Sequence, residues 1–174
     1  AGTAVRARTP LVGGVVGLFV TVAVLHLGSQ LTGADDVADA TQVLLMPLLA
    51  AALWLNTETP RSRLVTLTLV ALGLSWLGDS APKLTEGDTA FLVMIGFFLL
   101  AQVAYVMAFW PFRDRSVLHV RRPLLLGYVA VVVALVLACV GGAAGMLVPV
   151  LVYGTLLGTM AVLATGVNLP TAIG

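Results

Sequence analysis

The sequence predicts an all-α protein, a polytopic bundle of transmembrane helices. Of its 174 residues, 60% are hydrophobic and 10% are charged, whereas soluble domains are about 45–50% apolar and about 25% charged. The apolar residues gather in runs close to the roughly 20 residues that a membrane span needs. Within each run, apolar residues would cover all sides of a helix. They do not alternate with polar residues one by one, which argues against a membrane β-barrel.

Six apolar runs are expected to form spans, and short connections with turn-forming residues separate them. The runs are residues 11–28, 38–55, 64–80, 90–110, 123–140 and 145–165. No connection is long enough for a soluble domain, so residues 1–174 are interpreted as a single integral-membrane domain, and we expect it to be shortened at its C-terminus. The small-residue patterns GGVVG at 13–17 and GTLLG at 154–158 are expected to mark close helix packing.

The basic residues are distributed unevenly between the connections. Eight of the nine fall before the first run, between the second and third, or between the fourth and fifth: Arg6, Arg8, Arg61, Arg63, Arg113, Arg115, Arg121 and Arg122. Cytoplasmic loops carry the excess of Lys and Arg in membrane proteins. The bias predicts a multi-pass protein of the inner (cytoplasmic) membrane with its N-terminus in the cytoplasm. The arginines at 113–122 are expected to contact anionic headgroups.

Asp79 is the carboxylate that most needs a chemical explanation. It follows Ser75 by one helical turn at the outer end of the third run, in LGLSWLGDSAPKL, and Pro82 is expected to end that helix. At 1.5 Å per residue, it lies roughly 6 Å inside a boundary marked by Lys83. The helix C-terminus and partial desolvation both favour the protonated carboxyl group. The alternative interpretation is a helix that simply ends in polar residues.

Other polar residues lie at depths that suit a shared cavity. Gln102 and Tyr105 share one face of the fourth run, and Tyr153 lies in the sixth. Pro47 in the second run frees a backbone carbonyl that is available to line a cavity. We predict a tapering cavity with Gln102 as its floor and Asp79 as its rim. Interhelical hydrogen bonding is the alternative for Gln102 and Tyr105.

Several kinds of chemistry are missing from the sequence. His26 and His119 are expected at opposite membrane faces, so they do not form a multi-histidine metal site. The acidic trio at 35, 36 and 39 is interpreted as the start of the second helix, where negative charge suits the dipole. There is no P-loop, dinucleotide-binding turn or serine nucleophile elbow. We therefore expect no cofactor and no metal, and the net charge of +1 gives no reason to expect a nucleic-acid partner.

Four sequence elements occur in order over residues 40 to 162: TQVLLMPLLAAAL, LSWLGDS, GFFLLAQVAYVMAF and VPVLVYGTLLGTMA. The most specific is the Ser-x-x-Gly-Asp motif of Ser75, Gly78 and Asp79, and the next is the run that contains Tyr105. In this order and spacing, the elements resemble the YhhN family of membrane proteins, the lysoplasmalogenase group.

The resemblance implies eight spans in the full family fold and hydrolysis of the vinyl ether bond of a lysophospholipid by acid catalysis. Asp79 and Ser75 are then the candidate catalytic residues. The candidate substrate-binding residues are Gln102, Tyr105, Tyr153, Met46 and Pro47. A second carboxylate is implied in a Ser-Asp element near the seventh span, past Gly174. The implied partners are a membrane lipid or lysolipid substrate and the membrane, and a membrane-protein complex is left open as a further partner.

Two positions depart from the family pattern. Met46 stands where the family usually has lysine, and Gln102 stands where it often has histidine. Both changes remove a cationic or titratable group from the candidate cavity, so substrate and activity stay open. A composition rich in Ala, Val, Leu, Gly and Arg is typical of a high-GC bacterium, where another ether lipid or lysolipid is an alternative substrate.

Two other functions remain open. One is a non-catalytic membrane subunit or lipid-binding accessory protein of a larger complex, which is favoured if Met46 and Gln102 line a dry seam between helices. The other is a small transporter or channel. Transporters commonly contain repeated or inverted halves, and the sequence shows no clear internal repeat.

Overall fold

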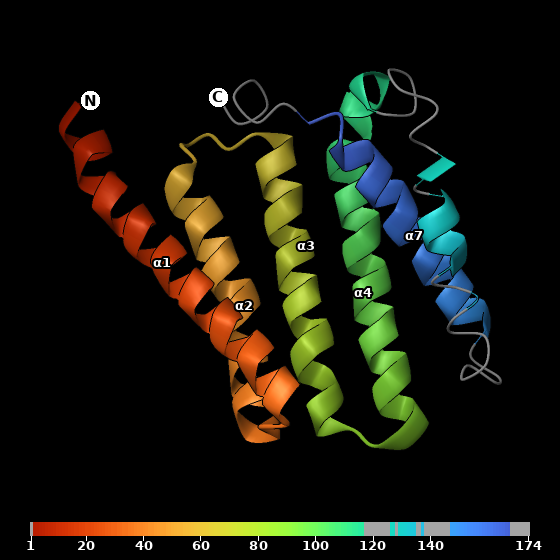
Figure 1. Ribbon diagram of the computed structural model, residues 1–174. Coiled ribbons are helices and arrows are strands. Elements are labelled where there is room, and N and C mark those ends of the chain that lie inside the picture. The colour runs from red at the N-terminus through yellow and green to blue at the C-terminus, as the bar shows by residue number, and fades with distance from the viewer. Residues whose placement is uncertain (1, 117–125, 128, 135–136, 138–146, 168–174) are drawn as a thin grey trace.

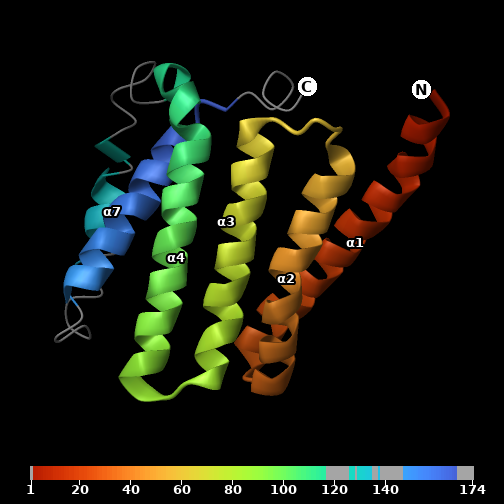
Figure 2. The same cartoon turned by 180° about the vertical axis from the view of Figure 1, so that it is seen from behind.

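The computed structural model describes residues 2–116, 126–127, 129–134, 137 and 147–167, which are helical or in turns and contain no β-strand. The helices are α1 (Gly2–Thr32), α2 (Asp35–Asn56), α3 (Arg63–Ser80), α4 (Gly87–Phe109) and α7 (Leu147–Ala164), with short 3-10 helices η1 (Ala81–Leu84) and η2 (Trp110–Arg115). Helices α1 to α4 run up and down in chain order, and α7 packs against α4 (Figure 1). The view from behind shows the same order (Figure 2). The predicted all-α class is confirmed for these residues.

Four helices among the described residues are long and apolar enough to cross a membrane: Pro10–Thr32, Asp35–Asn56, Arg63–Leu84 and Gly87–Arg115. They correspond to the first four predicted runs. The sixth run falls on α7, whose apolar stretch Leu151–Ala164 is shorter than the other four. The fifth run, 123–140, lies mostly outside the described residues. The predicted count of six spans is therefore not confirmed, and four candidate spans are found in the described part of the chain.

The turn from α1 to α2 has an identifiable cause. Gly33 has a φ angle of 70°, which glycine adopts without the steric penalty of a Cβ. The N–H of Ala34 donates to the carbonyl of Ser29 over 2.9 Å, the bond typical of a helix that ends in a Schellman motif. Asp35 and Asp36 then fill the first turn of α2, where the helix dipole favours negative charge. The turn therefore makes α1 and α2 antiparallel neighbours.

Both ends of α3 follow from its sequence. The Ser62 hydroxyl accepts a hydrogen bond from the N–H of Val65 at the start of the helix, which satisfies one of the free N–H groups there. The helix ends at Ser80, and Pro82 lies in the first turn of η1. The prediction that Pro82 follows the end of this helix is confirmed. This termination leaves Asp79 in the last turn of α3.

Small residues fill the interface between α3 and α4. The buried positions include Ala71 and Gly78 on α3 and Ala101, Ala104 and Ala108 on α4. Inside a bilayer, close van der Waals packing takes over from the hydrophobic effect as the force that joins helices. A Cβ built on Gly78 would lie 3.0 Å from ring atoms of Phe98. The glycine of the Ser-x-x-Gly-Asp motif therefore allows the Phe98 ring to lie directly against α3.

The two small-residue patterns behave differently. Cβ atoms built on Gly13, Gly14 and Gly17 meet nothing within 4 Å, so the prediction of close packing at GGVVG is wrong for the described chain. A Cβ built on Gly158 would lie 2.9 Å from Cγ2 of Val132. The GTLLG pattern therefore does mark a close approach.

The two ends of the bundle differ in charge. The acidic end, with the α1–α2 and α3–α4 turns, carries Lys83 and the carboxylates of Asp35, Asp36, Asp39, Glu86 and Asp88 (bottom of Figure 1). The arginine end carries Glu58, Asp114, Arg61, Arg63, Arg113 and Arg115. There the guanidinium of Arg61 lies 3.5 Å from the ring centroid of Trp54, and that of Arg113 lies 5.3 Å from Trp110. Tryptophan is enriched at membrane–water interfaces, so these pairs mark an interfacial level.

Candidate functional site

Asp79 is half-buried in the last turn of α3, and its carboxyl group faces α2. Nε2 of Gln42 donates a hydrogen bond to Oδ1 of Asp79 over 3.0 Å. Gln42 lies two turns into α2 and was not among the residues predicted for the site. It belongs to the TQVLLMP element, five residues before Pro47. Membership of this family-like element is the sequence feature that could have identified it.

Two further titratable side chains lie close enough to Asp79 to interact with it electrostatically, namely Lys83 and His26. Nζ of Lys83 lies 2.8 Å from Oδ1 of Asp39 and donates to the Asp39 carbonyl over 3.1 Å. These contacts attach η1 to the first turns of α2. We call Asp79, Gln42, Lys83, Asp39 and His26 the Asp79 cluster.

His26 joins α1 to this cluster. Its Nδ1 lies 3.1 Å from the carbonyl oxygen of Ala38 and 3.0 Å from Oγ1 of Thr41. A carbonyl oxygen accepts and never donates, so a bond to Ala38 places the proton on Nδ1. The ring is thereby oriented from the backbone of α2. No group of three or more His, Cys, Asp or Glu side chains in the described ranges is arranged to hold a metal ion.

The carbonyl freed by Pro47 has a partner from the neighbouring helix. Proline at 47 has no N–H for the carbonyl of Val43, four residues earlier. Nε1 of Trp76 donates to that carbonyl over 3.1 Å, and Pro47 itself is exposed. The structure therefore corrects the prediction that this carbonyl lines a cavity. It serves instead as an attachment point between α2 and α3, one turn from the Gln42–Asp79 bond.

Ser75 is buried, and its side chain lies close to that of Tyr105 on α4. The one-turn spacing of Ser75 and Asp79 therefore does not make them partners, since Ser75 faces α4 and Asp79 bonds to α2. Gln102 is 5% exposed. Its Oε1 atom and the Oγ atom of Ser80 are buried without a hydrogen-bond partner in the described part of the chain. Because an unsatisfied buried polar atom costs about 1–3 kcal/mol, water or the polar part of a ligand would be stabilised there.

The remaining predicted residues, Tyr153 and Met46, lie on α7 and α2 and have different neighbours. Tyr153 of α7 is partly buried, and its ring meets Phe98 edge-on with centroids 6.3 Å apart. Phe98 also covers Gly78, so Tyr153 reaches the Ser-x-x-Gly-Asp motif through this ring. Met46 is partly buried on α2. The structure thus brings Ser75 and Tyr105 into contact and connects Tyr153 to the motif, whereas Pro47 points away.

The geometry of the Asp79 carboxyl group has a chemical consequence. An amide N–H donates to Oδ1, so this oxygen acts as an acceptor whether the group is ionised or neutral. A proton on the neutral group is then carried by Oδ2. The arrangement therefore provides a carboxylic acid with one fixed oxygen and one oxygen that can donate, which is the requirement for a general acid.

The family model of the YhhN family matches residues 37–173. The chain matches no curated protein and no solved structure. The matched range includes α3, α4, α7 and all of α2 except its first two residues, and with them the Gln42–Asp79 and Ser75–Tyr105 pairs, whereas α1 precedes it. Because the match covers well over half of the sequence, the chain belongs to the YhhN family.

Proposed function

We propose that the protein is a lysoplasmalogenase-like membrane hydrolase that cleaves the vinyl ether, or a related bond, of a lysophospholipid by acid catalysis. The observation that supports this most directly is the half-buried Asp79 carboxyl group, held at Oδ1 by Gln42 inside a family motif. We place the protein in the inner membrane as a multi-pass protein with its N-terminus in the cytoplasm, because arginine gathers at one end of the bundle.

The proposed reaction begins with proton transfer from Oδ2 of Asp79 to the vinyl carbon that is not bonded to oxygen. The electrons of the C=C bond form the new C–H bond, which leaves an oxocarbenium ion. Water adds to the cationic carbon and gives up a proton, and a proton returns to the carboxylate. The resulting hemiacetal breaks its C–O bond to release a fatty aldehyde and a glycerophospho-base. General acid catalysis contributes about 10²–10⁴-fold to such steps.

The other residues of the site receive supporting roles in this proposal. Lys83 is the cation beside Asp79 and suits the phosphate of a lysophospholipid. The buried, unpaired oxygens of Ser80 and Gln102 suit the attacking water or a polar substrate atom. Ser75 and Tyr105 lie close together between α3 and α4 and act as positioning residues. The family resemblance implies a further carboxylate that would stabilise the cation. The test therefore uses the protein as its gene encodes it.

A non-catalytic membrane subunit, or a lipid-binding accessory protein of a larger complex, is the second candidate. It is supported by the burial of Gln102 on α4, which is 5% exposed, as expected for a residue that packs between helices. Met46 is also partly buried.

The test compares Asp79→Asn with Asp88→Asn and measures aldehyde release from a lysoplasmenyl lipid. Asparagine keeps the shape of Asp79 and removes its acidic proton, so turnover is expected to fall by about 10²-fold or more. Asp88 is exposed in the first turn of α4, and its variant should keep wild-type turnover. Wild-type turnover in a folded Asp79→Asn variant would exclude the proposed acid. Absence of aldehyde release by the unaltered protein would favour the subunit.

A further inference from the structure

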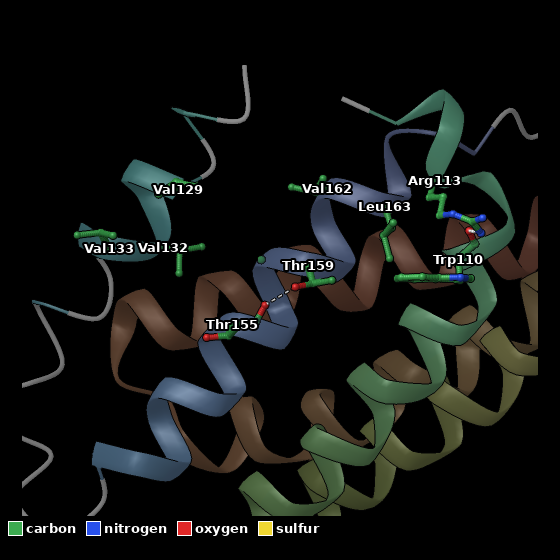
Figure 3. A pocket seen from close by; sticks show the side chains of 10 residues that line it. Trp110, Arg113, Val129, Val132, Val133, Thr155, Thr159, Val162 and Leu163 are labelled. Carbon is green, nitrogen blue, oxygen red and sulfur yellow. Dashed lines mark hydrogen bonds between the residues drawn. The ribbon is translucent and has the colours of Figure 1, made fainter. Parts of the chain in front are cut away.

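A groove of about 330 Å³ lies at the arginine end, between α7, η2 and residues 129–133, away from the Asp79 cluster. Its walls are mostly aliphatic, with Val129, Val132, Val133, Val162 and Leu163. Trp110 and Arg113 lie together beside Leu163 and form one border (Figure 3). The volume falls in the range of about 300–1,000 Å³ typical of small-molecule sites.

The hydroxyl groups inside the groove are already bonded to their own helix. Oγ1 of Thr155 donates to the carbonyl of Leu151, and Oγ1 of Thr159 donates to the carbonyl of Thr155, each over 2.8 Å. These two hydroxyls therefore do not call for a polar ligand, and the inner part of the groove suits a hydrocarbon. From Thr155 to Leu163, the groove follows α7 for about 12 Å at 1.5 Å per residue, which accommodates a section of an acyl chain.

Arg113 makes one end of the groove suitable for an anion. Its contacts in the described chain are long: Nη1 to the carbonyl of Trp110 at 3.4 Å and Nε to Oδ1 of Asp114 at 3.9 Å. A guanidinium has five N–H donors, so the group retains donors for a phosphate. Asp114 is 75% exposed at its side chain and opposes the charge of Arg113 only in part.

We propose that this groove binds an anionic diacyl phospholipid of the surrounding bilayer. One acyl chain lies along α7 against the valines, and the phosphate meets Arg113 beside Trp110, at the interfacial level that the tryptophan–arginine pairs mark. Arginine and phosphate form charge-assisted, often bidentate hydrogen bonds, and an apolar groove that ends in a cation complements such a lipid in both shape and charge. This site is separate from the proposed hydrolysis and does not depend on it.

The test measures lipid binding in nanodiscs made of phosphatidylcholine with or without phosphatidylglycerol. After detergent release, native mass spectrometry counts the lipids that stay on the protein. The unaltered protein should retain phosphatidylglycerol selectively. Arg113→Gln should weaken this retention about fivefold, since a basic residue near an anionic lipid contributes about 1 kcal/mol. Arg115→Gln is the matched control, because Arg115 is exposed on η2 and does not line the groove.

The hydrocarbon half of the site is tested by filling it. Thr159→Phe places a ring in the groove and should displace phosphatidylglycerol, while aldehyde release stays unchanged. If Thr159→Phe does not fold, Val133→Phe fills the same groove from its other wall. Equal losses in Arg113→Gln and Arg115→Gln would indicate diffuse charge attraction and overturn the proposal. Retention of phosphatidylcholine or of a second protein in place of phosphatidylglycerol would also overturn it.

Discussion

Gln42 joins α2 to the carboxyl group of Asp79 by a hydrogen bond, although it was not among the residues predicted for the site. Its amide fixes Oδ1 of Asp79 over 3.0 Å, so the direction in which Oδ2 can release a proton depends on α2. General acids act through geometry first, because the proton must lie within hydrogen-bond reach of its target. We therefore assign Gln42 a positioning role that acts through Asp79.

Gln42→Leu tests this role at the scale of one hydrogen bond. Leucine has a similar volume and no donor, so turnover should fall by about tenfold, which corresponds to roughly 1.4 kcal/mol of transition-state stabilisation. The Michaelis constant should hardly change, because the lost bond orients the acid and does not bind the substrate. Gln30→Leu, at an exposed position of α1, is the control. A rise in the Michaelis constant at unchanged kcat would instead assign Gln42 to substrate binding.

Sequence reasoning singled out Asp79 and Ser75 as candidate residues but did not predict which side chains they face. An acidic residue at the end of an apolar run stands out because burial of a charge is costly. The linear sequence is enough to show such a residue. Its hydrogen-bond partner lies 37 residues away, and no local pattern encodes that pairing. The same applies to Ser75, whose one-turn spacing indicated Asp79, although its side chain faces Tyr105 on another helix.

At the scale of helices, α2 and α3 are joined by a hydrogen bond from the Trp76 side chain to a backbone carbonyl that lacks its partner within α2. Pro47 leaves the Val43 carbonyl without its helical N–H, and the Trp76 indole supplies the missing donor. A membrane interior offers no water to replace that donor. The pairing therefore allows a proline inside α2 and sets the position of α2 beside Asp79.

A double-mutant cycle tests this pairing. Trp76→Phe should destabilise the protein by about 1–3 kcal/mol, because it leaves the Val43 carbonyl without a donor at a depth where the membrane offers no water. In a Pro47→Ala background, the new alanine N–H can bond to Val43, so the same change should cost less. Unfolding in mixed detergent micelles gives both free energies. Trp54→Phe, at the arginine end, should show no such dependence on residue 47, and equal costs of Trp76→Phe in the two backgrounds would refute the pairing.

The glycine of the motif yields a prediction for the α3–α4 interface. A Cβ at Gly78 would lie 3.0 Å from the Phe98 ring, whereas one at Gly73 meets nothing within 4 Å. Gly78→Val should therefore destabilise the protein by about 1–3 kcal/mol through overpacking. Gly73→Val, on the same helix and with the same change in helix propensity, should not. Similar unfolding free energies for the two variants would show that Phe98 moves aside freely.

The helices themselves were the most predictable part of the fold. Runs of apolar residues and their turn formers placed α1 to α4, because length and hydrophobicity determine what can span a bilayer. The predictions at GGVVG and at Pro47 went wrong for a shared reason: a small residue or a proline shows where contact is allowed, but not which surface makes it. The contacts are made at Gly158 and Gly78, and the freed carbonyl faces Trp76.

At the scale of the whole molecule, charge separates two functions that we propose for opposite ends. The Asp79 cluster lies at the acidic end, and the groove beside Arg113 lies at the arginine end. If arginine marks the cytoplasmic side, the proposed hydrolysis takes place near the outer leaflet and the proposed phospholipid is bound from the inner leaflet. Anionic lipids of the cytoplasmic leaflet attract basic segments, which agrees with the second assignment.

This arrangement predicts which residues are accessible from outside the cell. Replacing the single cysteine, Cys139, with alanine gives a background for new cysteines at Asp36 and Glu86 on the acidic end and at Arg63 and Arg115 on the arginine end. All four positions are exposed, so differences in labelling report sidedness and not burial. A membrane-impermeant maleimide is applied to cells whose outer barrier is permeable and whose inner membrane is intact. It should label the cysteines at 36 and 86. Those at 63 and 115 should react only after the inner membrane is opened. The reverse pattern would place Asp79 in the cytoplasmic leaflet, and the lysolipid would then have to reach the site from inside the cell.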